Sequence, residues 1–172
     1  KYGADALRMG LIVGNTPGTD IALSEDKIKG YKHFANKIWN AARFVLINAE
    51  NIKLSEKPDL DPNDQGSIQE LNELVANVTK DMEDFKFYLA AEKIYHYFWH
   101  TFADKIIEEA KEKLKNGGEA EKLSKQWTIL EILATSMQLL HPFMPFVTEK
   151  IWEHIPKDKE KKLLIIEQWP QV

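Results

Sequence analysis

The sequence predicts an all-α protein, an antiparallel helix bundle with small appendages at its two ends. Apolar residues recur every three or four positions along most of the chain, which is the period of an amphipathic helix. Clusters of Pro, Gly, Asn and Asp separate these stretches. Only residues 163–166 are typical of a strand, and a lone strand forms no sheet. A chain of 172 residues, 44% of them hydrophobic, can bury a substantial core in one domain.

The longest predicted helix covers residues 24–47 and is expected to lie at the centre of the bundle. Ser24 is a suitable N-cap. Glu25 and Asp26 place negative charge in the first turn, where the helix dipole favours it. One face of this helix is expected to be buried because its residues are apolar at helical spacing. They are Ile28, Tyr31, Ala35, Ile38, Ala42, Val45 and Ala49, flanked by Phe34, Ala41 and Leu46.

The remaining elements follow from local signals. Residues 2–13 predict a short helix, and residues 15–20 are dense in turn formers. Residues 50–66 hold two prolines and no aromatic residue, which indicates an exposed connection. Residues 67–70 (Ser-Ile-Gln-Glu) fit a capping box, so a helix is expected to begin there and to fade near Asp84. Further helices are expected over residues 87–115, 119–140 and 145–154, and a charged turn over residues 157–162.

Composition and motifs exclude several kinds of site. Without cysteine there is no disulfide, thiolate metal site or Cys nucleophile. No apolar run reaches the roughly 20 residues that span a bilayer, so we expect no membrane partner and a cytoplasmic location. Phosphate-binding loops and a Gly-flanked Ser are absent. His96 and His100 stand four apart but lack the Glu of a helical zinc motif, so no metal site and no catalytic residue is predicted.

A row of basic and amide residues lies opposite the apolar face of the helix over residues 24–47. No Asp or Glu occurs between positions 27 and 49, although the chain has a net charge of −4. Solvated helix faces usually mix Lys with Glu, because i,i+4 pairs stabilise a helix. The row can neutralise phosphates and read base edges, so RNA contact is one interpretation and an ordinary solvated face is the other. This basic row consists of Lys29, Lys32, Asn36, Asn40 and Arg43.

Aromatic residues provide a second kind of candidate contact. Phe44 falls between the basic row and the apolar face, where its ring could stack on an unpaired base. Aromatic residues are also dense between positions 85 and 102, but Tyr95, Phe98 and Phe102 keep the spacing of a helix core. Tyr97 lies roughly opposite that core face and is expected to be free.

Four separated motifs resemble the C-terminal part of class I valyl-tRNA synthetases. The absence of an initiator Met is also typical of a piece cut from a longer protein. The segments GTDIALSEDKI and NKIWNAARFVL favour the valyl family over the isoleucyl and leucyl families, which remain alternatives. In chain order the motifs are KYGADALRMGL, GTDIALSEDKIKGYKHFANKIWNAARFVL, YHYFWHTFADK, and LLHPFMPFVTEKIWEHIP with a closing EQWP.

The resemblance implies a division of the chain and a function. Residues 1–23 would end a stem-contact region and linker, residues 24–156 would form a helical anticodon-binding domain, and residues 157–172 a C-terminal extension. This bundle would bind the anticodon stem and loop of tRNA(Val) and position the tRNA for a catalytic domain in the same polypeptide. That parent enzyme would use ATP and Mg²⁺. The H-I-G-H and K-M-S-K-S motifs are absent, so this chain is expected to be non-catalytic by itself and to hold no cofactor.

The resemblance also suggests which residues contact RNA. In related methionyl enzymes an Asn and an Arg on the equivalent helix read the anticodon; Asn40 matches that Asn, and the Arg position falls at Arg43 or Phe44. The alternative function is a helical protein-interaction module whose basic row meets an acidic partner, whereas an independent enzyme lacks a nucleophile, base or metal set. The residues predicted to bind RNA are Lys29, Lys32, Asn36, Lys37, Asn40, Arg43 and Phe44.

Overall fold

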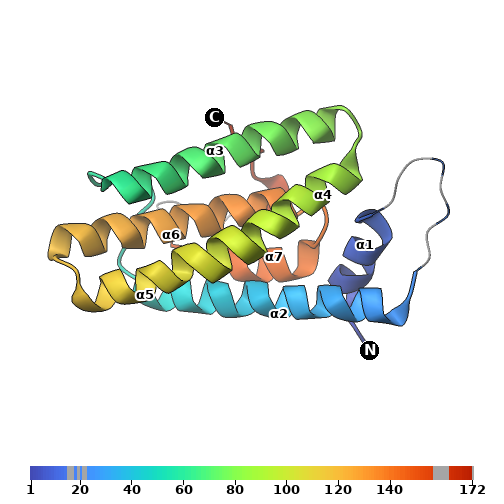
Figure 1. Cartoon of the computed structure of the whole chain (residues 1–172), viewed down its shortest axis with the longest axis horizontal. Helices are drawn as coiled ribbons and strands as arrows, with labels where there is room; N and C mark the ends of the chain where they lie inside the picture. Colours follow the sequence, from blue (N-terminus) through green and yellow to red (C-terminus); the bar gives the residue numbers. More distant parts are fainter. Residues whose placement is uncertain (15–17, 19, 21–22, 157–162, 172) are drawn as a thin grey trace.

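The computed structural model is an all-helical bundle, as predicted, and it describes residues 1–14, 18, 20, 23–156 and 163–171 (Figure 1). Part of the predicted loop over residues 15–20 and the charged turn over residues 157–162 lie outside the described residues. Within the described part of the chain there is no strand and no helix long and apolar enough to cross a membrane. The helices are α1 (Ala4–Ile12), α2 (Glu25–Asn48), α3 (Pro62–Glu83), α4 (Phe87–His96), α5 (Ile107–Asn116), α6 (Glu119–Leu140) and α7 (Pro145–Trp152).

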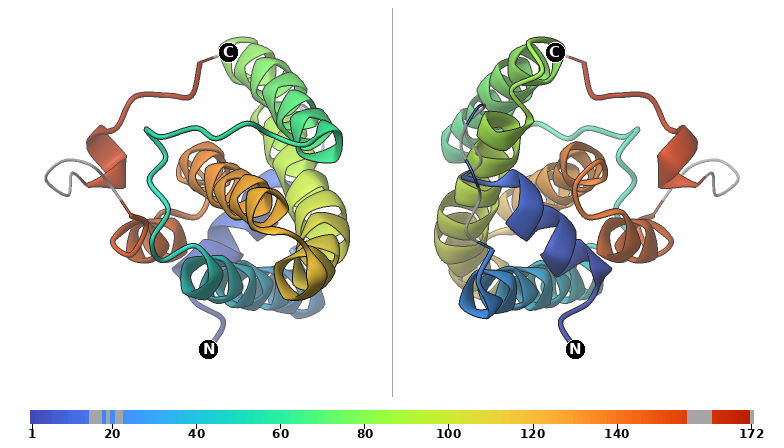
Figure 2. Two further views of the ribbon diagram at one scale, coloured as in Figure 1. Left: turned by 90° about the vertical axis from the view of Figure 1, so that its left-hand side faces the viewer. Right: turned by 90° about the vertical axis from the view of Figure 1, so that its right-hand side faces the viewer.

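Helix α6 occupies the centre of the bundle, and the other long helices surround it (Figure 2). It packs against α2, α3, α4, α5 and α7. Its buried residues, among them Thr128, Leu130 and Met137, occupy all sides of the helix, which is typical of an enclosed helix. The expectation that the helix over residues 24–47 is central is therefore wrong. That helix, α2, buries only one face, so it lies at the edge of the bundle.

One continuous rod runs from α4 to α5 through a π-helical segment, Tyr97–Ile106. The predicted helix over residues 87–115 is thus confirmed in extent, but its middle is wider than an α-helix. Phe98 and Phe102 point from this segment into the core, with ring centroids 5.2 Å apart, and Phe34 of α2 meets Phe98 at 6.0 Å. Gly117 ends the rod as the predicted stop signal requires.

Helix α3 begins earlier than predicted. Asp61 is its N-cap and accepts hydrogen bonds from the backbone N–H groups of Asn63 and Asp64, at 2.9 and 3.0 Å. The predicted start at residues 67–70 is wrong, because Pro62 at the first helical position and the Asp61 cap supply a stronger signal. Ser67 instead donates to the carbonyl of Asn63 inside the helix, at 3.1 Å.

Both ends of the chain pack against the bundle. Asp5 of α1 accepts hydrogen bonds from the N–H groups of Phe146 and Val147 in the first turn of α7, at 3.2 and 2.7 Å. At the other end the strand expectation is wrong, since Leu164–Ile166 form a short 3₁₀ turn. Glu149 accepts the N–H of Leu164 at 2.8 Å, which ties this turn to α7.

Candidate nucleic-acid interface

Helix α2 orients the predicted RNA-binding residues by burying its other face. Ser24 accepts a hydrogen bond from the N–H of Lys27 at 3.2 Å, so the predicted N-cap is confirmed. Phe34, Ile38 and Val45 are fully buried against the bundle. Because a helix has two opposite faces, this burial directs the residues on the other side outward.

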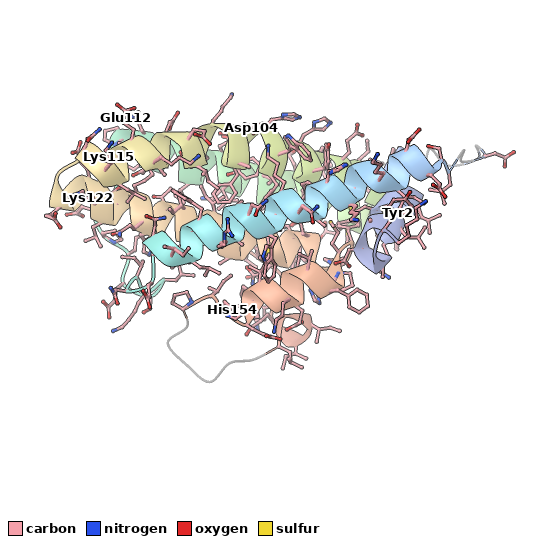
Figure 3. All side chains as sticks on the ribbon, turned by 90° about the horizontal axis from the view of Figure 1, so that it is seen from below. Tyr2, Asp104, Glu112, Lys115, Lys122 and His154 are labelled. Carbon is pink, nitrogen blue, oxygen red and sulfur yellow. The ribbon has the colours of Figure 1, made fainter. Side chains whose placement is uncertain are left out.

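The basic row is exposed along the length of α2. Among the described residues, no hydrogen bond or ion pair engages any of its five side chains. At 100° per residue they fall within about 80° of one another, so they form a single stripe rather than a scatter. Figure 3 views this face, with α2 between the α4–α5 rod and α7. The prediction that the row faces outward together is confirmed.

Lys37 lies at the edge of this face and already has two partners. Its ammonium pairs with Asp104 of the π-helical segment and lies 4.4 Å from the ring centroid of Trp99. The hydrogen bond from Lys37 holds the pKa of Asp104 below its usual range. Lys37 is therefore half-buried and joins α2 to the neighbouring rod, so it differs from the free lysines of the basic row.

Phe44 is half-buried between the basic row and the core. Its ring packs against the edge of the hydrophobic core, and the ammonium of Lys111 lies 6.0 Å from the ring centroid. One side of the ring is thus occupied by the protein. The stacking role predicted for Phe44 stays a prediction, and it concerns the part of the ring that is still exposed.

Tyr97 is buried, so the expectation that it is free is wrong. It is 6% exposed, and burial raises the pKa of its hydroxyl well above the ordinary value. Glu70 of α3 also raises this pKa, so α3 lies on the side of the rod that the helical spacing had left free. Nearby, the rings of His96 and His100 stack at 5.7 Å on the surface, and no metal-binding cluster occurs among the described residues.

A groove that sequence reasoning missed separates α2 from α7. It has a volume of about 470 Å³. His154, which follows α7, is labelled at this edge of the face in Figure 3. In the sequence Trp39 stands four residues before Arg43, on the same side of the helix, but this spacing does not reveal the second wall of the groove. The α2–α7 groove is lined by Trp39, Ala42, Arg43, Leu46, Ile47, Glu50, Ile151 and His154.

Comparison with known families identifies this helical bundle. A family model described as the anticodon-binding domain of tRNA ligase matches residues 64–172. The chain belongs to this anticodon-binding domain family. A TM-score of 0.65 relates the domain to a chain in the crystal structure of a ternary complex of Agrobacterium radiobacter K84 LeuRS, tRNA and LeuAMS. That match covers 98% of this chain and 19% of the other at 20% identity, so it shows the fold.

Sequence relatives of the anticodon-binding domain confirm the resemblance to valyl-tRNA synthetases. The chain is 41% identical over 175 residues to a valine–tRNA ligase of Bacillus thuringiensis subsp. konkukian, with all of this chain covered. It is 38% identical over 185 residues to a valine–tRNA ligase of Aquifex aeolicus, with 99% covered. The chain spans 20% and 16% of the lengths of these two relatives.

Proposed function

We propose that this domain binds the anticodon stem and loop of tRNA(Val) through the outer face of α2. It would thereby position the tRNA for aminoacylation by a catalytic domain elsewhere in the same polypeptide. The observation that carries the proposal is the basic row, a set of exposed side chains with no partners in the described part of the chain. The family match and the names of the relatives support tRNA as the partner.

The charged and the amide residues of the basic row suit different parts of an RNA. Lys29, Lys32 and Arg43 are cations that can neutralise phosphates and fix the register of the RNA. Asn36 and Asn40 carry both donors and acceptors, which suits contacts with base edges. The exposed part of the Phe44 ring would add stacking, and Lys37 would contribute less because Asp104 already engages its ammonium.

The parent enzyme in this proposal is an ATP-dependent valine–tRNA ligase of the cytoplasm. ATP and Mg²⁺ would act in its catalytic domain, not in this bundle. The isoleucyl and leucyl families remain the nearest alternatives for the tRNA that is bound. A protein-interaction module is the alternative of another class, because an acidic protein surface would also complement the basic row.

A binding titration with matched RNAs tests the proposal. Fluorescence of the five tryptophans would be followed while tRNA(Val), tRNA(Ile), tRNA(Leu) or tRNA(Val) with an altered anticodon loop is added. We expect tRNA(Val) to bind most tightly and Arg43→Ala to weaken that binding. Equal binding of all four RNAs would remove the assignment to valine, and no binding of any RNA would favour the protein-interaction alternative.

A further inference from the structure

The α2–α7 groove adjoins the basic row and shares Arg43 with it. Trp39, Arg43 and Ile47 are spaced four apart, so they lie one above another on the side of α2 that faces α7. Glu50 lies two residues beyond the end of the helix and also lines the groove. Ile151 of α7 and His154 form the opposite wall. An RNA held on the basic row would therefore reach the groove without crossing any other element.

The walls of the groove suit a flat aromatic group. Trp39 is 43% exposed and Ile47 is 70% exposed, although both are large and apolar. Any nucleobase can stack on an aromatic side chain, because every base has a π-face. The volume of about 470 Å³ lies within the range of sites that bind small ligands, so a base with its sugar can enter.

Two opposite charges stand in the groove without partners of their own. Within the described residues, neither the guanidinium of Arg43 nor the carboxylate of Glu50 makes a hydrogen bond or an ion pair. In this described part of the chain they form no ion pair with each other either, so both charges are available to a ligand. Arg43 can only donate hydrogen bonds and an ionised Glu50 can only accept them.

This pair of charges selects among possible occupants. A carboxylate accepts a hydrogen bond from the exocyclic amine of a base, whereas uracil has only its N3–H donor, which lies between two carbonyl oxygens that repel a carboxylate. Arg43 can meanwhile donate to a ring nitrogen, a carbonyl oxygen or a phosphate. An acidic peptide fits poorly, because Glu50 would repel it at one end of the groove.

We propose that the α2–α7 groove binds one unpaired base of the RNA loop and selects a base with an exocyclic amine through Glu50. This inference rests on the proposed function and names the base chemistry that the same interface reads. Trp39 stacks on the base, Arg43 holds its phosphate or ring edge, and Glu50 accepts the amine. Uracil at that loop position is disfavoured.

The first experiment finds the base that enters the groove. The 172-residue chain is titrated with anticodon stem–loop hairpins that carry 2-aminopurine at one loop position each. Stacking on Trp39 should quench the fluorescence at a single position, and Trp39→Ala should abolish that quenching while binding persists. Quenching that is unchanged in Trp39→Ala at every position would overturn the proposal.

The second experiment tests the selection by Glu50. At the quenched position, the natural base is compared with its analogue that lacks the amine, purine riboside for adenosine or pyrimidin-2-one riboside for cytidine. Removing the amine should weaken binding to the natural chain by roughly 10-fold. The same removal should have no further effect in Glu50→Ala, and Glu112→Ala is the matched control at the opposite edge of the face (Figure 3).

Failure of this inference differs from failure of the proposed function. If amine removal weakens binding equally in the natural chain and in Glu50→Ala, Glu50 does not read the base. The proposed function would still stand if Lys32→Ala lowered the affinity and its dependence on salt. If no hairpin binds at any salt concentration, both are wrong. Circular dichroism of each variant confirms that it is folded before binding is compared.

Discussion

Lys125 and Asp64 form an ion pair in which both side chains are completely buried, where the first turn of α3 meets α6. Ser124 donates a hydrogen bond to the same carboxylate at 2.6 Å. Beside them, Lys113 of α5 pairs with Asp61, the N-cap of α3. Charged contacts thus join three helices at the end of the bundle where the α5–α6 turn lies.

Removing the cation of the buried pair should destabilise the protein strongly. Lys125→Met leaves the carboxylate of Asp64 buried without its partner, so we expect the free energy of unfolding to fall by about 3–5 kcal/mol. Urea unfolding followed by circular dichroism measures this change. The double variant with Asp64→Leu should recover much of the loss, because an apolar pair of similar volume needs no counter-charge. A double variant no more stable than Lys125→Met would contradict this account of the pair.

Two lysines of α2 should affect RNA binding differently. Lys32→Ala removes a free cation, so the slope of log affinity against log salt concentration should fall by about 0.7–0.9. Lys37→Ala should change that slope less, because Asp104 and Trp99 already engage the ammonium of Lys37. Fluorescence anisotropy of a labelled anticodon stem–loop at several potassium chloride concentrations measures both slopes. Equal changes in the two variants would show that the ion pair opens when RNA binds.

His141 should make the protein less stable as the pH falls. Burial lowers the pKa of its imidazole below 6.5, although the nearby carboxylates of Glu149 and Asp5 oppose this shift. The unfolded chain therefore binds a proton at a higher pH than the folded chain does. Stability is unaffected well above pH 6.5 and is lost as the pH falls through 6.5 toward the folded pKa.

The comparison that isolates His141 is between the natural chain and His141→Gln. Between pH 7.5 and 5.5, roughly one pH unit on either side of the ordinary pKa, the natural chain should lose more unfolding free energy than the variant. Every other titrating group is shared by the two proteins, so their difference reports on His141. Parallel pH profiles would mean that His141 titrates alike in the folded and unfolded chains.

Asp5 should hold α1 on α7. Its carboxylate satisfies two N–H groups at the start of α7, as an N-cap would, although it comes from a residue far away in sequence. Asp5→Ala should lower the unfolding free energy by about 1–2 kcal/mol. Asp59→Ala is a suitable control because Asp59 is exposed and caps no helix. Loss of the same size in the control would show that the contact with α7 contributes nothing.

Local sequence signals predicted the helices where those signals were unambiguous. The Ser24 cap, the alternation of faces along α2 and the stop at Gly117 depend on neighbouring residues only, so all three predictions were confirmed. The start of α3 was wrong because two signals competed, and the Asp61–Pro62 pair prevailed over the capping box. Helix α6 is central because other helices pack on all its sides. The apolar residues along one face of its sequence did not show this.

At the candidate site, too, the sequence predicted some features and missed others. Exposure of Lys32, Asn40 and Arg43 could be predicted, because each lies opposite the buried face of its own helix. The partners of Lys37 come from another segment of the fold, and Tyr97 is buried on the side of the rod where Glu70 of α3 lies. The α2–α7 groove needs His154 from a segment more than a hundred positions away, so no pattern within α2 alone could reveal it.

Chemical labelling of lysines tests most directly whether the outer face of α2 binds RNA. The chain would be acetylated briefly with and without an anticodon stem–loop of tRNA(Val), and each lysine quantified by mass spectrometry. Lys29 and Lys32 should be protected by the RNA, whereas Lys80 of α3, on the far side of the bundle from α2 (Figure 1), should react equally in both samples. Protection of Lys80 with full reactivity at Lys29 and Lys32 would contradict the assignment.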